Sequence, residues 1–291
     1  DSRTPLYFLV LASCINVALE VLFILVFAWG VPGAALATVL AQLLSGLLCL
    51  FYISRRLPSL HIGREDWLAS RKVLWQHLRI GLPMGLQSSV IALGAIVLQV
   101  ALNQLGPTAI AAYAAAQKVD AIAIMPMMSF GMTMAAYTAQ NFGAQKIGRI
   151  ERGVRQCIFM SVAFSLLIAV FNISLGSSIM HLFVGDGQQQ VIDYGHTYLV
   201  VNGVCYSILS LLFIYRYTLQ GLGQSVVPTI AGIMELLMRG GAAFLLVDMF
   251  GYIGACFANP LAWVGSCLPL AVAYYLTQRS LRRSYPERLA E

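Results

Sequence analysis

The sequence contains 291 residues, of which 59% are hydrophobic and only 10% are charged, and its mean hydropathy is +0.78. Soluble domains carry about 25% charged residues, so this composition excludes a soluble globular protein. The net charge of +6 does not indicate nucleic-acid binding, because the cations lie in connections between apolar runs and form no basic face. The expected partner of this surface is a lipid bilayer.

Eight apolar runs follow one another, and each is long enough to cross a bilayer as a helix. They cover residues 5–29, 33–54, 80–104, 113–137, 154–176, 191–215, 227–249 and 252–277. Continuous apolar stretches of this length exclude a transmembrane β-barrel, whose strands alternate polar and apolar residues over segments of about ten. The predicted fold class is therefore an all-α polytopic membrane protein with eight transmembrane helices.

The connections between these runs alternate in charge. Most Lys and Arg residues fall in the stretches 55–79, 146–155 and 279–288, whereas the connections at 30–33, 106–108, 185–187 and 250–251 carry none. The positive-inside rule assigns the basic connections to the cytoplasm. We therefore expect both termini to be cytoplasmic, in a plasma membrane such as the bacterial inner membrane. The connection 220–225 is the exception, because only Arg216 lies near it.

Residues 30–42 (GVPGAALATVLAQ) and 251–263 (GYIGACFANPLAW) form an internal repeat at an offset of 221 residues, which corresponds to six spans. Each copy follows a glycine-marked outer turn and opens a helix with a basic tail. A parallel repeat of six-helix bundles is a transporter architecture. The repeat therefore predicts two lobes of six helices.

This prediction divides the chain into four parts. We expect the last two helices of an N-terminal lobe at 1–55, an amphipathic cytoplasmic linker at 56–78, a complete six-helix lobe at 79–283 and a cytoplasmic tail at 284–291. Four further helices are then expected upstream of residue 1. Because half of the cavity wall would come from them, we expect that these 291 residues alone do not transport.

Four motifs resemble those of the multidrug and toxic compound extrusion (MATE) transporters. They are Gly30-Val-Pro-Gly-Ala-Ala35, Gly81-Leu-Pro-Met-Gly-Leu-Gln87, Ala139-Gln-Asn-Phe-Gly-Ala144 and Leu219-Gln-Gly-Leu-Gly-Gln-Ser225. The resemblance runs along nearly the whole chain and corresponds to helices five to twelve of a twelve-helix family. It implies a cation- or proton-coupled antiporter, monomeric when full length, that exports amphipathic and often cationic compounds. Na⁺ or H⁺ would be the coupling ion, with no further cofactor.

Ionisable groups inside spans are costly and invite functional hypotheses. Asn16 and Glu20 lie one turn apart, and Thr38 lies near the start of the next helix, so the three offer an amide, a carboxylate and a hydroxyl. In the DinF-like branch of the family, a first-lobe cation site consists of an Asn and an Asp on helix five, a Thr on helix six and an Asp on helix one, the last of which is not in this chain. Asn16, Glu20 and Thr38 resemble this set, with Glu in place of Asp, and make a monovalent cation site possible. The alternative is an interhelical hydrogen bond.

The NorM-like branch places acids on helices seven and ten, which are acid-free here, so second-lobe sodium coupling of that type is not expected. Three other ionisable residues are candidates for ion coupling. Asp120 is two residues from Lys118, a spacing that does not share a helix face, and we expect it to face the cavity alone. Glu235 and Arg239 are four residues apart and can pair, so their alternative role is a structural ion pair.

Polar, aromatic and thioether side chains of the second lobe are candidates for the substrate cavity: Gln87, Gln99, Asn103, Gln117, Met128, Tyr194, Tyr198 and Tyr206. The three tyrosines form one helical stripe that would offer aromatic faces to a cationic drug. The alternatives are packing or lipid contact for the methionine and an interfacial position for Tyr194.

Two other functions compete with multidrug export. A flippase of a lipid-linked oligosaccharide or peptidoglycan precursor would line its cavity with several cations, and Lys118, Arg216 and Arg239 are few for that task. An intramembrane enzyme would show a catalytic constellation, but no His-Glu zinc motif occurs in the sequence. We therefore expect a transporter and not an enzyme.

Overall fold

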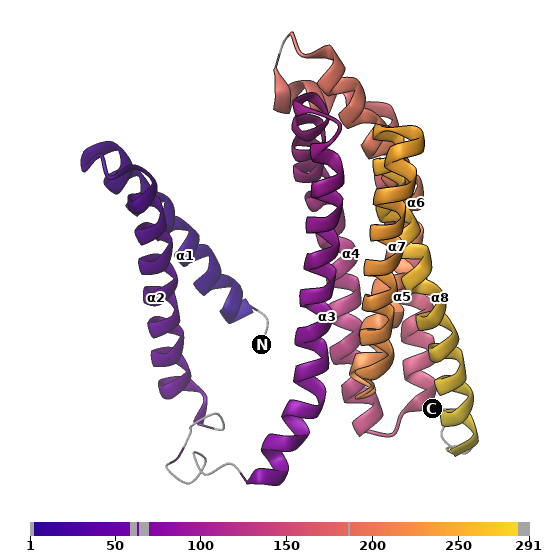
Figure 1. Ribbon diagram of the computed structural model, residues 1–291. Helices are drawn as coiled ribbons and strands as arrows, with labels where there is room; N and C mark the ends of the chain where they lie inside the picture. The colour runs from indigo at the N-terminus through magenta and orange to yellow at the C-terminus, as the bar shows by residue number, and fades with distance from the viewer. Residues whose placement is uncertain (1–2, 59–62, 64–69, 186, 285–291) are drawn as a thin grey trace. The chain divides into compact units, whose positions relative to one another are not determined.

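The computed structural model describes residues 3–58, 63, 70–185 and 187–284 and is helical in these ranges apart from short connections (Figure 1). Within them, the eight predicted crossings are confirmed as eight long apolar helical segments. The elements are α1 (Arg3–Val21) with its π-helical continuation η1 (Leu22–Val26), α2 (Gly30–Arg56), α3 (Arg71–Asn103), α4 (Pro107–Gly143), α5 (Ile147–Val184), α6 (Gln189–Gly221), α7 (Val226–Phe250) and α8 (Tyr252–Ser284).

Several helices are longer than the apolar runs that predicted them. The run at 154–176 lies inside α5, which begins at Ile147 and ends at Val184, and the run at 113–137 lies inside α4. Hydropathy marks only the part of a helix suited to hydrocarbon, whereas polar residues such as Arg149 and Arg152 continue the helix beyond it. The number of spans was therefore easier to predict than their ends.

The chain divides into two units, Asp1–Leu74 (unit 1) and Trp75–Glu291 (unit 2). Residues 59–62 and 64–69 of the predicted linker and residues 285–291 of the predicted tail lie outside the described ranges, whereas residues 71–78 of the predicted linker form the start of α3. The four-part division therefore stays a prediction.

In unit 1, α1 with η1 and α2 form an antiparallel hairpin (Figure 1). The rings of Phe23 and Trp29 pack at the turn, with their centroids 5.1 Å apart. Near the other end of the hairpin, Ser45 Oγ donates a hydrogen bond to the Phe8 carbonyl at 2.9 Å. These contacts fix which face of α1 meets α2.

The two copies of the sequence repeat share their local structure. Gly30 and Gly251 both have φ of +58°, a left-handed conformation that favours glycine. A Cβ at Gly33 would lie 3.0 Å from the Trp29 Cβ, and a Cβ at Gly254 would lie 1.9 Å from the Leu246 carbonyl oxygen. In each copy, the first glycine therefore forms the turn, and the second glycine lets the new helix pack closely against the preceding segment.

Unit 2 is arranged around α6, which packs against α4, α5 and α8, while α7 packs along α8. Small and hydroxyl side chains line the α5–α6 interface, where Ser165 Oγ and Ser207 Oγ lie 3.0 Å apart. The helix α3 is bonded to α7, because Thr229 Oγ1 donates to the Pro83 carbonyl at 3.1 Å. This arrangement encloses polar groups of α3, α4, α6, α7 and α8.

Candidate functional site

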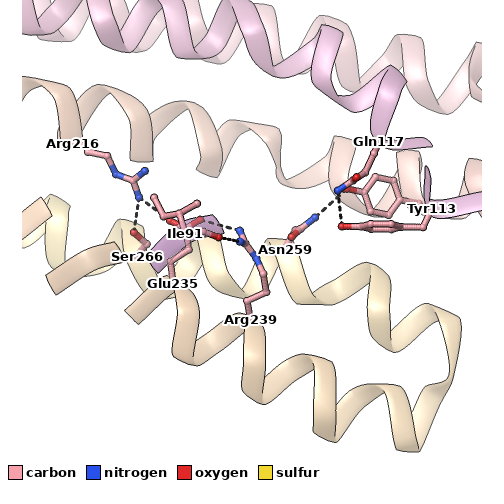
Figure 2. Close-up of polar contacts among 9 residues, drawn as sticks. Ile91, Tyr113, Gln117, Arg216, Glu235, Arg239, Asn259 and Ser266 are labelled. Atoms are coloured by element: carbon pink, nitrogen blue, oxygen red, sulfur yellow. Dashed lines mark hydrogen bonds and ion pairs between the residues drawn. The ribbon is translucent and has the colours of Figure 1, made fainter. Parts of the chain in front are cut away.

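A buried carboxylate in unit 2 is held between two arginines (Figure 2). Glu235 Oε1 on α7 accepts a hydrogen bond from Arg239 Nη2, one turn later, at 2.9 Å. Glu235 Oε2 accepts one from Arg216 Nη2 of α6 at 2.8 Å. The three side chains are 6–8% exposed. This Arg216–Glu235–Arg239 triad combines two guanidinium groups with one carboxylate and therefore carries one excess positive charge.

The triad also contacts α8 and α3. Arg216 Nη2 donates to Ser266 Oγ at 3.2 Å, and Arg239 Nη1 donates to the Ile91 carbonyl at 3.3 Å. Arg239 approaches α3 at Gly94, where a Cβ would lie 3.0 Å from Nη1. The buried Nε atoms of both arginines have no hydrogen-bond partner in the described part of the chain. The two arginines therefore keep unused donor capacity inside unit 2.

A cavity of about 410 Å³ lies beside the triad. Its polar lining comes from Gln87, Ser88, Arg216, Tyr217, Gln220 and Glu235, and its apolar lining from Met84, Ile91, Ile124, Met128, Leu209, Leu212, Phe213 and Trp263. Small-molecule sites typically have volumes of ~300–1,000 Å³ and combine apolar walls with a few polar groups. The cavity fits this description.

A second polar cluster surrounds Asp120 on α4. Tyr198 OH of α6 donates to Asp120 Oδ2 at 3.1 Å, and Tyr206 OH donates to Oδ1. Asn259 of α8 donates to Tyr198 OH at 3.0 Å, and Asn172 of α5 donates to Tyr206 OH at 3.4 Å. Within the described ranges, no ion pair joins Asp120 to a cation. Neutral donors from α6 therefore hold this buried carboxylate.

A third polar group lies in unit 1. Asn16 Nδ2 is 3.3 Å from both Glu20 Oε1 and Thr38 Oγ1, so one amide is bonded to both expected partners. Asn16 and Glu20 are half-buried, and Thr38 is exposed. The three side chains expected to cooperate are thus adjacent, and their hydrogen bonds join α1 to α2.

The MatE family model matches residues 83–245, which is more than half of the chain. The chain belongs to the MatE family. The matched segment begins in α3 and ends in α7, so it includes both Asp120 and the triad.

Two relatives of this MatE chain come from Bacillus subtilis (strain 168). The chain is 30% identical over 225 residues to the probable multidrug resistance protein YpnP, a match that covers 77% of the chain and 49% of YpnP. It is 26% identical over 285 residues to the probable multidrug resistance protein YoeA, covering 94% of the chain and 61% of YoeA. The chain therefore spans about half to three fifths of the length of these relatives.

Solved structures show the same fold. An outward-facing multidrug resistance MATE family transporter of the MOP superfamily gives a TM-score of 0.87 at 21% identity, covering 95% of this chain and 62% of that one. The Vibrio cholerae MATE transporter VcmN in its bent form gives a TM-score of 0.85 at 20% identity, covering 98% and 64%. The fold of this chain is thus that of MATE transporters.

The candidate residues of the MatE chain fall into separate groups. Gln87, Met128 and Glu235 meet at the cavity, with Arg239 bonded to Glu235. Gln99 and Asn103 are bonded to each other at 3.3 Å on α3, where Gln99 is half-buried and Asn103 is exposed. These two residues are not among those that form the cavity in the described part of the chain.

The tyrosine stripe and Gln117 lie elsewhere in unit 2. Tyr198 and Tyr206 are completely buried, and both hydroxyls are bonded to Asp120. Tyr194 stacks on Tyr252, with ring centroids 4.4 Å apart. Gln117 Nε2 donates to Tyr113 OH at 2.7 Å, and Figure 2 shows Asn259 between this pair and the triad.

Sequence reasoning missed three contacts of these groups. The pairing of Glu235 with Arg239 followed from their spacing, but the second partner, Arg216, lies on another helix. Asn259 and Ser266 of α8 were not singled out, although each is bonded to a member of a cluster. The available signal was the basic residue Arg216 directly after the predicted run 191–215, with no acid one turn away on the same helix.

Proposed function

We propose that this chain forms part of a cation- or proton-coupled antiporter that exports amphipathic small molecules, organic cations among them, by alternating access. The observation that carries the proposal is the cavity of unit 2, in which a largely apolar wall surrounds a few polar side chains. Such a lining suits compounds with an apolar body and a polar group. The relatives' names favour multidrug export over a precursor flippase, and a transporter over an enzyme.

Two carboxylates are the proposed points of ion coupling. Glu20 is bonded to an amide that also contacts Thr38, which supports a proton relay or a Na⁺ site of the DinF-like kind. Asp120 is buried without a counterion in the described ranges, so binding of H⁺ or Na⁺ would relieve a costly charge. Binding at Asp120 would change hydrogen bonds between α4 and α6, and binding at Glu20 would change its bond to Asn16, which in turn contacts Thr38 of α2.

The cellular setting is proposed from the charge pattern. Basic residues at both ends favour a plasma membrane orientation with cytoplasmic termini, as in the bacterial inner membrane. The chain would supply helices five to twelve of the transporter, which we expect to be monomeric. These 291 residues by themselves are not expected to transport.

The test measures efflux of ethidium from proteoliposomes that contain the full-length protein. Imposed pH and Na⁺ gradients are applied separately, with ionophore-treated vesicles as the control. We expect one of the two gradients to accelerate efflux. Efflux that is independent of both gradients would rule out the antiporter.

A further inference from the structure

The cavity of unit 2 has an electrostatic character opposite to that expected for a site that takes only organic cations. Glu235 is the acid among its lining residues, and both carboxylate oxygens already accept bonds from arginines. Arg216 is the basic lining residue, and the triad has one excess positive charge. A carboxylate engaged in this way is poorly placed to bind a cation.

Two buried donors and one buried acceptor at the cavity have no hydrogen-bond partner in the described part of the chain: Arg216 Nε, Gln87 Nε2 and Gln220 Oε1. Both hydrogen bonds that Arg216 makes in the described part of the chain come from Nη2, and its buried Nε has none. Gln87 is 4% exposed and lines the cavity; its Oε1 accepts a bond from Gln220, but its Nε2 has no partner in the same ranges. An unpaired buried donor is costly, and acidic oxygens are its strongest partners.

We infer that the cavity beside the triad is a subsite for the acidic group of an amphiphilic organic anion or zwitterion. A carboxylate, sulfonate or phosphate accepts hydrogen bonds from Arg216 and Gln87 and neutralises the excess charge of the triad. The apolar body of the same compound packs against Met128, Phe213 and Trp263 of the cavity wall. The meaning of this subsite for export rests on the proposed function, but the binding itself does not.

The test measures binding of two dyes with the same xanthene core, anionic fluorescein and cationic rhodamine 123. Purified protein, as encoded in its genome, is titrated in non-ionic detergent, and fluorescence polarisation gives the Kd of each dye. We expect fluorescein to bind about tenfold or more tightly at this cavity than rhodamine 123. Fluorescein binding that is absent or no tighter than rhodamine binding overturns the inference, whatever the efflux assay shows.

Two variants locate the binding. Arg216→Gln leaves Glu235 paired with Arg239, and Gln87→Glu places a carboxylate in the cavity wall that neutralises the triad. Both should weaken fluorescein binding about tenfold. The melting temperature of each variant is measured alongside, and weaker fluorescein binding at an unchanged melting temperature cannot be attributed to misfolding. Unchanged fluorescein binding in both variants overturns the inference.

Arg282→Gln is the matched control. Arg282 is half-exposed and paired with Glu151 on the surface between α8 and α5, and it does not line this cavity. Its fluorescein affinity should equal that of the unchanged protein, and a tenfold loss there would show a surface charge effect and overturn the assignment.

A competition arm distinguishes the source of the acidic group. Dioleoyl phosphatidylglycerol added to the micelles displaces fluorescein competitively if an anionic headgroup is the occupant. No displacement identifies a soluble organic anion. Both outcomes keep the acidic-group subsite.

Discussion

Tyr206 on α6 donates a hydrogen bond to the carboxylate of Asp120 on α4, although 86 residues separate the two in the sequence. The other carboxylate oxygen accepts its bond from Tyr198, two turns earlier on α6. The Cα atoms of the two tyrosines are about 12 Å apart along the helix axis, so their side chains must converge to reach Asp120. Any cation or proton that binds this carboxylate must compete with, or rearrange, contacts between α4 and α6.

Asp120→Asn tests whether this cluster couples ion movement to transport. Asn has the same shape and keeps one acceptor oxygen, so we expect stability to fall by only about 1 kcal/mol. Gradient-driven efflux in proteoliposomes should fall by about tenfold or more, because the group that changes charge is gone.

Asp193→Asn is the control for Asp120→Asn, because Asp193 is bonded to Gln189 near the exposed start of α6. Its efflux should match that of the unchanged protein. Equal efflux of Asp120→Asn and Asp193→Asn would restrict Asp120 to a structural role.

Glu20→Gln tests the coupling role of unit 1. Gln keeps an oxygen that accepts the hydrogen bond from Asn16 but removes the charge, so the α1–α2 hairpin should remain folded. We expect proton- or sodium-driven efflux to fall by about tenfold or more in the genome-encoded protein. Ser13→Ala is a control on the same helix, since Ser13 Oγ donates to the Leu9 carbonyl one turn earlier on α1. Unchanged efflux of Glu20→Gln would restrict Glu20 to a structural hydrogen bond with Asn16 within α1.

The pattern of the sequence was sufficient for the helices and for contacts within one helix. Long apolar runs predicted the spans, and the spacing of four residues predicted the bond between Glu235 and Arg239. The glycine repeat predicted equivalent turns, and Gly30 and Gly251 have the same φ. These features depend on residues that are close together in the sequence, so the sequence alone is enough to predict them.

Contacts between helices were not predictable in the same way. Tyr198 and Tyr206 were recognised as one stripe, but a stripe does not reveal which helix it faces, and their partner proved to be Asp120. Arg216 was noted as the cation near the connection 220–225, but its bond to Glu235 depends on how α6 packs against α7. Helices in a bilayer pack where their shapes fit and where small residues allow close approach. Small residues in a sequence therefore indicate that a helix has a close neighbour, but not which helix that neighbour is.

Gly254→Ala should destabilise the α7–α8 pair. A Cβ at this position would lie 1.9 Å from the Leu246 carbonyl oxygen, and backbone cannot move aside as a flexible side chain does. We expect a loss of about 2 kcal/mol or more in unfolding free energy, measured by denaturation in detergent. Gly241→Ala is the control, because within the described ranges no atom beyond the adjoining residues and backbone of α7 lies within 4 Å of its Cβ position, and alanine favours the helix. Equal stability of the two variants would contradict the close packing at Gly254.

The charge pattern predicts which connections are cytoplasmic, and single cysteines test it. In a background where Cys14, Cys49, Cys157, Cys205, Cys256 and Cys267 are replaced by alanine, we expect Gln188→Cys to react with a membrane-impermeant maleimide in intact cells. Lys146→Cys should react only after permeabilisation, because it lies in a basic connection. Val226→Cys probes the connection with few cations and should behave like Lys146→Cys, since an odd number of crossings separates each from Gln188. Labelling of Lys146→Cys but not Gln188→Cys in intact cells would invert the orientation, and labelling of Val226→Cys together with Gln188→Cys would contradict the crossing by α6.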